Sequence, residues 1–394
     1  MVEIIEVKTK KDIKEFINFP IKLYKNDPYY VPALYMDELK MFKPNYVYYD
    51  QSTAKCFIAK KNGKTVGRIQ AIIQKAANNK YNQKRIRFTR FDSIDDLEVS
   101  NALFDKIKDY AKENNMDEIV GPLGFSDLER EGLLIEGFDQ KQTFEEQYNY
   151  SYYQKLIENY GFSKEVDWTE SIIKNQEDKK IQEKIIKLAD TVLKRNKLHI
   201  GKAKNVKDFL NKYADKFFDI LDESYENVYG TVPFTDGMKK LFISNFNLLI
   251  DLRFVCVVLN ENEEPVCMGL CLPSIAEAVK KSNGHLTIPA IIRILKAKKN
   301  PKIIDFALIG VKPTYQMKGV NVIVLAEIMK MLNNKSVLYA ETNLNLETNE
   351  EVLAQWKYFD AKTNKRRRCF IKKIWFFFFL LNCIKSIDFL NWFL

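Results

Sequence analysis

The sequence is poor in the residues on which several common catalytic sites depend. Only His199 and His285 occur among 394 residues, and neither lies in a recognisable motif. A histidine-rich metal site or a Ser-His-Asp triad needs at least one such residue, so we expect neither. The six cysteines show no CxxC spacing, which is the usual signature of zinc and dithiol sites. We therefore predict structural thiols and no metal centre.

The chain also lacks an apolar run near its N-terminus. Glu3, Glu6 and several lysines interrupt any signal peptide there, and together with the unpaired cysteines this predicts a reduced, cytoplasmic setting. The balance of 62 basic against 52 acidic residues gives a formal charge of +10, which favours acidic partners in general. These charges are spread along the chain, so a solvated surface explains most of them. We expect no nucleic-acid partner.

What the sequence does hold is enough apolar material for two domains. The chain has 394 residues, which is longer than one domain of usual size, and 46% of them are hydrophobic. The order of the predicted elements is that of an α/β protein. In the first half we expect a hairpin at 55–73, a strand at 85–91, a helix at 97–113 and a strand at 118–122. In the second half we expect helices at 181–192, 207–225 and 236–250, a hairpin at 254–272, and strands at 303–311 and 335–341.

Each of the two hairpins is followed by a strand, a helix and another strand. This repetition suggests a duplicated module, although no sequence identity between the halves accompanies it. The polar and charged segment at 175–180 is the candidate boundary between the two modules.

The most informative stretch is the strand–turn–helix pattern at 303–333. An apolar, β-branched run ends at Pro313, and a short polar turn then opens a segment with apolar residues at helical spacing. Such a turn leaves backbone N–H groups unpaired at the start of the helix. With the helix dipole, these groups form a site for phosphate. The alternative is an ordinary strand–turn–helix that binds no ligand.

The turn resembles the pyrophosphate loop of the GNAT acyltransferases, Gln/Arg-x-x-Gly-x-Gly/Ala, which holds acyl-coenzyme A. Asn321 stands where that family prefers Gly or Ala. The corresponding turn after Phe91 has no such pattern, so the first half resembles a GNAT module without its cofactor loop. The resemblance implies that acetyl-CoA or another acyl-CoA is a substrate, bound by Gln316, Met317, Lys318, Gly319, Val320 and Asn321.

Further segments resemble a large bacterial family of tandem GNAT-like proteins of this length, whose substrates are not established. They are Tyr148-Asn149, Tyr152-Tyr153, Gly161-Phe162 and the stretch from Leu272 to Gly284. The resemblance covers residues 5–373 and implies an α/β fold of two GNAT-like modules, each a mixed sheet flanked by helices. We expect a degenerate module at 1–175, an acyl-CoA-binding module at 176–374 and an apolar tail at 375–394. The loops at 121–162, rich in aromatics and glycine, either line a binding surface or pack the halves together.

The resemblance also suggests where catalysis would occur. In GNAT folds the strand before the cofactor loop and the next strand diverge, and the acyl group enters between them. Glu341, at the end of the second strand, is the first candidate for the base that deprotonates the amine, although a solvated strand-end glutamate is the alternative. The remaining candidates are Tyr358 or Tyr339 as the acid for the leaving thiolate, Ile309 to Val311 as backbone donors to the thioester carbonyl, and Asn349, which opens a helix at 350–359.

The end of the chain combines charge with an apolar run. Residues 365–373 carry six positive charges, and the aromatic stretch at 374–381 is about half the length of a membrane span. Residues 365–394 are therefore either a peripheral membrane contact or a simple extension of the chain. As a whole, the sequence and the resemblance predict an acyl-CoA-dependent N-acyltransferase that acts on an unidentified amine and is either freely cytoplasmic or cytoplasmic with a peripheral membrane contact. The alternative is a non-catalytic GNAT-like binding or scaffold protein.

Overall fold

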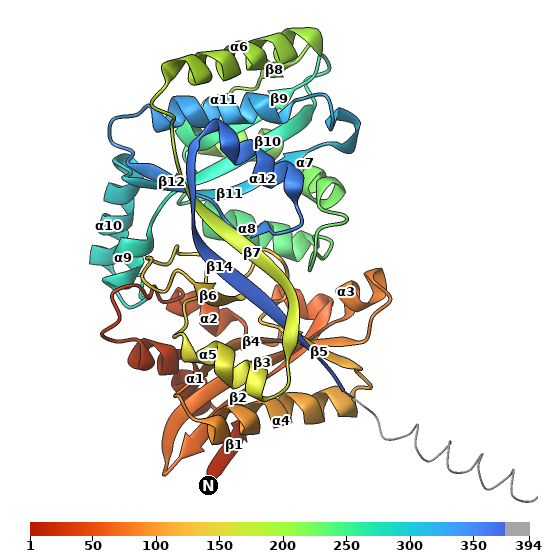
Figure 1. The fold of residues 1–394 in the computed structure, drawn as a ribbon, viewed down its shortest axis with the longest axis vertical. Helices are drawn as coiled ribbons and strands as arrows, with labels where there is room; N and C mark the ends of the chain where they lie inside the picture. The colour runs from red at the N-terminus through yellow and green to blue at the C-terminus, as the bar shows by residue number, and fades with distance from the viewer. Residues whose placement is uncertain (375–394) are drawn as a thin grey trace, which may run out of the picture.

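The computed structural model describes residues 1–374 (Figure 1). The first half supplies strands β1 (Val2–Glu6), β2 (Ser52–Lys61), β3 (Lys64–Gln74), β4 (Arg85–Ser93), β5 (Glu118–Gly121), β6 (Leu133–Glu136) and β7 (Ser163–Lys174). Its helices are α1 (Lys10–Leu23), α2 (Tyr35–Lys40), α3 (Lys75–Lys80), α4 (Leu97–Glu113) and α5 (Tyr152–Asn159).

The second half repeats this plan with longer helices. Its strands are β8 (His199–Ile200), β9 (Val255–Leu259), β10 (Pro265–Pro273), β11 (Ile303–Val311), β12 (Tyr339–Glu341), β13 (Asn345–Leu346) and β14 (Asp360–Lys373). Its helices are α6 (Lys179–Arg195), α7 (Val206–Ser224), α8 (Asp236–Phe246), α9 (Ala276–Lys280), α10 (Ile288–Lys299), α11 (Asn321–Leu332) and α12 (Glu350–Gln355). No helix within residues 1–374 has both the length and the apolar character needed to cross a bilayer.

Local sequence explains where the long helices begin. The side chains of Asp96 and Asp178 cap α4 and α6 by accepting from backbone N–H groups of the first turn, and Asn205 does the same for α7. α4 then buries Val99, Leu103 and Ile107 at helical spacing, together with other apolar side chains of the same face. Each helix therefore combines a start signal with one apolar face that packs on the sheet.

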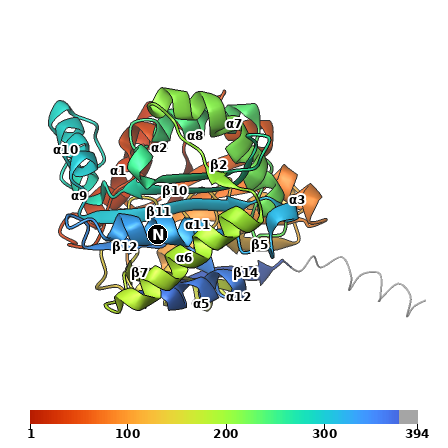
Figure 2. The ribbon, with the colours of Figure 1, turned by 90° about the horizontal axis from the view of Figure 1, so that it is seen from above.

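One continuous mixed sheet runs through both halves, with helices on both of its faces (Figure 2). The strand order is β1-β2-β3-β4-β5-β14-β7-β12-β11-β10-β9-β8. The last strand of each half is thus exchanged, because β14 lies between β5 and β7, while β7 lies between β14 and β12. Figure 1 shows β7 and β14 running side by side through the middle of the molecule.

The exchanged strands carry a buried cluster of charges. Glu170 of β7 accepts from the Lys365 ammonium at 2.7 Å and from the Arg367 guanidinium at 2.6 Å, and none of the three is more than about 1% exposed. Lys365 also contacts Glu341 at 2.6 Å. Buried charges are tolerated only when they are paired, so this cluster ties β14 to β7.

The same cluster changes the interpretation of the basic run at 365–373. Lys365 and Arg367 are buried on carboxylates, and Arg368 pairs with Asp167 at 2.8 Å. Three of the six basic side chains are therefore not available to attract an anionic membrane, and no contact among the described residues supports the membrane contact predicted for residues 365–373. The apolar tail predicted at 375–394 lies outside the described residues.

Candidate active site

The predicted cofactor loop lies between β11 and α11. After β11 the chain passes through two residues of positive φ, Met317 at 63° and Gly319 at 74°. α11 then begins with no side-chain cap. Within residues 1–374, no acceptor pairs with the backbone N–H groups of Gly319, Val320 and Asn321. Unpaired donors at the start of a 12-residue helix suit a phosphate group.

The side chains of this loop point away from the protein. Gln316, Met317 and Lys318 are exposed. The Gln316 amide donates to the carbonyl of Val311 at 3.2 Å, and the Lys318 ammonium lies 4.6 Å from the centre of the Tyr315 ring. Their exposure leaves the loop accessible to a large anionic ligand.

The strand that precedes the loop diverges from its neighbour, as the resemblance to GNAT folds implies. β11 and β12 pair over three positions only, from Ile303–Tyr339 to Asp305–Glu341. Beyond that point two side chains reach into the gap. The Asn343 amide donates to the Ala307 carbonyl at 2.6 Å, and the Tyr225 hydroxyl donates to the Ile309 carbonyl at 2.8 Å. Beyond Asp305 this edge of β11 therefore has no strand of the described chain paired with it.

Two cavities meet at this divergence. The smaller cavity, with a volume of about 70 Å³, lies beside α11 and α12. The larger cavity, with a volume of about 200 Å³, lies between the two halves of the chain. They share seven lining residues, which include Tyr225, Ala307, Leu308 and Ile309. The open edge of β11 therefore forms the boundary between them, where an acyl group from one side would meet an acceptor from the other.

The larger cavity, which we call the acid-lined cavity, has many carboxyl groups in its lining. Among the described residues no lysine or arginine lines it. Such a lining attracts a cation and repels an anion. Its five acidic residues are Asp127, Glu129, Glu131, Glu145 and Glu146.

Burial raises the pKa of four of these five carboxyl groups. The pKa of Asp127 rises to about 6, that of Glu146 to about 7 and that of Glu145 to about 8. Burial, and then the neighbouring Asp127, also raises the pKa of Glu131 well above its usual value. Carboxyl groups that titrate near neutral pH inside a cavity suit proton transfer, and an entering cation would favour their ionised forms.

Glu145 and Glu146 differ in what holds them. Glu146 lies 3.7 Å from the Arg367 guanidinium, at the edge of the buried charge cluster. Glu145 makes no hydrogen bond or ion pair with any described residue, and its Oε1 atom is buried without a partner. Glu145 is therefore free to accept a proton, and so is Glu131, for which the described residues also provide no hydrogen bond or ion pair. Of these two, Glu145 is the one with a buried oxygen left without a partner.

Some of the predicted site residues line the two cavities, and others do not. Ile309 lines both cavities, and Asn349 lines the acid-lined cavity and caps α12 by accepting from the Val352 N–H at 3.2 Å. Glu341 is 6% exposed and is bound by Lys365 and by the Asn364 amide at 2.8 Å. Tyr358 is half-buried against the core of the second half and lines neither cavity, and the same holds for Val311 at the end of β11. Glu341 thus orients the buried cluster, whereas Glu145 faces the cavity.

The acidic residues at 127–131 and 145–146 were not identified from the sequence. They lie in the loops at 121–162, for which a binding surface and packing between the halves were both considered. In the structure the tyrosines at 148, 150, 152 and 153 pack in the core of the first half and not between the halves, whereas the acids line the cavity. The sequence feature that could have identified these acidic residues is their concentration in two short runs flanked by apolar and aromatic residues.

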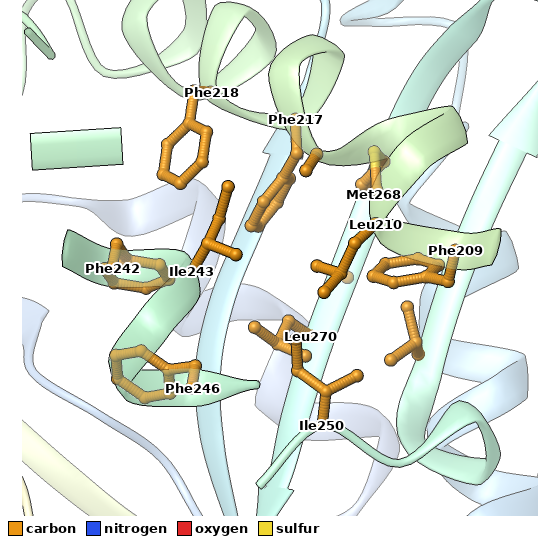
Figure 3. Close-up of a pocket in the computed structure, with 13 residues that line it drawn as sticks. Phe209, Leu210, Phe217, Phe218, Phe242, Ile243, Phe246, Ile250, Met268 and Leu270 are labelled. Carbon is orange, nitrogen blue, oxygen red and sulfur yellow. The ribbon is translucent and has the colours of Figure 1, made fainter. Parts of the chain in front are cut away.

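Two further cavities adjoin the acid-lined one. A cavity of about 210 Å³, which we call the first-half cavity, is lined by Arg68, Arg90 and Arg130 and shares Glu145 and Phe246 with it. An apolar pocket of about 30 Å³ lies between α7, α8 and β10. Figure 3 shows aromatic and aliphatic side chains of these elements pointing into it. This pocket shares Phe242 and Phe246 with the acid-lined cavity.

Sequence comparison gives two similar proteins over most of the chain, and no family model matches. The protein YghO of Escherichia coli K12 is 25% identical over 377 residues, which cover 93% of this chain and 94% of that protein. The bacterial ceramide synthase of Caulobacter vibrioides is 26% identical over 323 residues, which cover 80% of this chain and 82% of that protein.

Structure comparison gives neighbours of the same overall fold. A tandem GNAT protein from the clavulanic acid biosynthesis pathway, solved without acetyl-CoA, has a TM-score of 0.53 at 9% identity, covering 95% of this chain and 98% of that one. A GCN5-related glucosamine N-acetyltransferase region in a fungal β-N-acetylglucosaminidase has a TM-score of 0.54 at 12% identity, covering 94% of this chain and 38% of that one. The likeness therefore extends over both halves of this chain.

Proposed function

We propose that this chain, which has the tandem GNAT fold, is an acyl-CoA-dependent N-acyltransferase that acts on a cationic amine. The observation that carries this proposal is the acid-lined cavity, because its five carboxyl groups lie beside the open edge of β11 with no basic residue among them. A scaffold protein has no need of carboxyl groups such as Glu131 and Glu145, which are buried here without a hydrogen bond or ion pair from the described residues, since burying them costs stability. The non-catalytic alternative is therefore not favoured.

In the proposed reaction the pyrophosphate of acyl-CoA binds the N–H groups at the start of α11 and the thioester lies along β11. Backbone N–H groups near Ile309 stabilise the oxyanion. Glu145 takes a proton from the ammonium group, the amine nitrogen attacks the thioester carbon, and the C–S bond breaks. The thiolate takes a proton from a nearby acid, and the second proton, which leaves the nitrogen as the amide forms, restores that acid. The sequence suggests Tyr358 or Tyr339 for this acid, and Tyr225, whose hydroxyl lies at the divergence, is a further candidate.

For the acceptor, the relative named as a ceramide synthase suggests an amine with a long apolar chain, since a ceramide is an N-acylated long-chain amino alcohol. The apolar pocket in Figure 3 supports this choice, because it adjoins the acid-lined cavity through Phe242 and Phe246. At about 30 Å³ it holds only a few methylene groups without movement of these side chains. We therefore expect the chain to extend past α8, with the amine held among the carboxyl groups.

The proposal is tested by measuring thiol release from acetyl-CoA and from longer acyl-CoAs with a panel of amines. We expect turnover with long-chain amino alcohols, and turnover that falls as the alkyl chain of the amine is shortened. Polar amines of equal charge serve as the comparison. Binding of acyl-CoA in calorimetry without turnover on any amine would instead favour the scaffold alternative.

A substitution in the cofactor loop tests the donor side. Gly319→Val should weaken acyl-CoA binding by about tenfold or more, because a β-branched residue disfavours a φ of 74° and the loop must change shape. The fold should persist, since the nearest atom to an added Cβ is Val192 Cγ2 at 3.7 Å. Calorimetric titration with acetyl-CoA gives the affinity.

Gly63→Val provides the matched control for this loop variant. Gly63 lies in the β2–β3 turn at a φ of 73°, and an added Cβ would meet no atom within 4 Å. The Gly63→Val variant should therefore have the same backbone strain as Gly319→Val, but its affinity for acetyl-CoA should equal that of the wild type. Equal affinity in wild type and a folded Gly319→Val variant would remove the loop from the site.

A further inference from the structure

The helix α10 presents an apolar stripe to solvent. Ile288, Ile291, Ile292 and Leu295 are between 37% and 76% exposed. Their spacing of three and four residues places them on one face, while Ala290 and Ile294 on the opposite face are buried. Helices of soluble domains usually bury such a stripe, so its exposure here indicates that another molecule binds to this face.

The surroundings of this stripe are basic. Between Ala278 and Ile304 the chain has seven lysines and arginines and no acidic residue. Four lysines there are exposed, and no carboxylate of the described chain lies within ion-pair distance of them; they are Lys281, Lys296, Lys299 and Lys302. The partner of this face should therefore combine apolar groups with negative charge.

We propose that α10 docks on the surface of an anionic lipid membrane, with its apolar stripe among the acyl chains and its lysines at the headgroups. An exposed apolar stripe bordered by lysines has the chemistry of an interfacial helix. A second copy of this chain fits less well, because a two-fold contact between α10 helices would bring the same positive charges together. In Figures 1 and 2, α10 lies at one side of the molecule.

The position of α10 links docking to the cavities. The loop before α10 is attached to the segment that lines the first-half cavity, since the Tyr35 N–H donates to the Gly284 carbonyl at 2.9 Å and the Tyr35 and His285 rings stack at 4.5 Å. Residues 32–34 and Leu249 line that cavity, which adjoins the acid-lined one. Docking would thus bring a membrane-dissolved amine close to the acceptor side. This last step rests on the proposed function, whereas docking itself does not.

Vesicle co-sedimentation of the full-length protein tests the docking inference. We expect binding to vesicles of phosphatidylcholine with phosphatidylglycerol, weaker binding to phosphatidylcholine alone, and weakening with added salt. Ile292→Glu with Leu295→Glu should lower the partition coefficient by about tenfold or more, because two apolar anchors are lost. Lys296→Glu with Lys299→Glu should lower it and reduce its dependence on salt.

Leu188→Glu with Leu338→Glu is the matched control, since these side chains are 44% and 62% exposed on other elements. This control should bind vesicles as the wild type does, and thermal unfolding followed by circular dichroism should show all variants folded. Unchanged binding by the α10 variants would overturn the inference. So would a wild-type dimer that binds no vesicles and that the α10 substitutions convert to a monomer, because a second copy would then cover the helix. Neither result bears on acyl transfer, which is assayed without lipid.

Discussion

Glu145→Gln should lower kcat by about 100-fold or more while leaving acyl-CoA binding unchanged. General bases contribute roughly 10² to 10⁴ to such rates, and Glu145 brings to the cavity a buried carboxyl oxygen that has no partner among the described residues. Its pKa, raised by burial to about 8, lies near the working pH, as the transfer of a proton from an amine requires. Steady-state kinetics with a saturating long-chain amine gives kcat, and calorimetry gives the acyl-CoA affinity.

The pH dependence of kcat/KM should also identify Glu145 as the base. The base must be ionised in the free enzyme, so kcat/KM of the wild type should rise with pH up to about 8 and then level off. Glu145→Gln should lose this rise. Asp127→Asn, in the same cavity but with a pKa of about 6, should mainly raise KM for the amine and should keep the rise. A normal profile in Glu145→Gln would assign the base to another residue.

Stability should change in the opposite direction to activity. Between the ordinary glutamate pKa and about 8, folded Glu145 retains a proton that the unfolded chain has lost, so its contribution to stability falls as pH rises through this window. Glutamine avoids this cost. Glu145→Gln should therefore be more stable than wild type at pH 8, by a few kcal/mol at most, and the difference should shrink towards pH 5. Urea denaturation at both pH values measures it, and a destabilised variant at pH 8 would contradict the proposed environment.

Much of the fold could be predicted because the sequence signals are local. The strand at 303–311, the helix at 97–113 and the strand that starts at Glu118 depend on apolar periodicity and on caps such as Asp96, which lie within a few residues of the elements they define. The tandem plan followed from the order of these elements. The candidate donor site could be found in the same way, since a loop and the start of the next helix are contiguous in sequence.

The acceptor side could not be predicted because it depends on contacts between distant residues. β7 contains Asp167 and Glu170, two charged residues that are unusual in a central strand. Their burial becomes tolerable through β14, almost 200 residues later, where Lys365 and Arg367 pair with Glu170 and Arg368 pairs with Asp167. Glu145 resembles a surface residue until the two halves enclose it. α10 was not predicted either, because its apolar residues face outward and lack the buried partner that a helical pattern implies.

The exchange of β7 and β14 changes the expectation for the separate halves. If 1–175 and 176–374 were independent modules, residues 176–374 alone would keep any acyl-CoA affinity. In the structure, however, β5 would lose β14 as its neighbour, and β7 would lose both β14 and β12. Glu170 would also remain in a half without Lys365 and Arg367. Leaving a buried charge without its partner costs about 3–5 kcal/mol, a large part of the stability of a typical domain.

We therefore expect neither half to fold when it is produced alone, and the two halves to assemble when they are produced together. Circular dichroism and gel filtration should show each isolated half to be unfolded or aggregated, whereas the co-expressed halves should co-purify and bind acetyl-CoA as the whole chain does. Cleaving the intact protein at an engineered protease site within 175–178, between β7 and α6, controls for the loss of the peptide link and should leave the halves associated. Cooperative unfolding and full acetyl-CoA affinity in residues 176–374 alone would show that the second half is self-sufficient, and that β14 can do without its neighbours from the first.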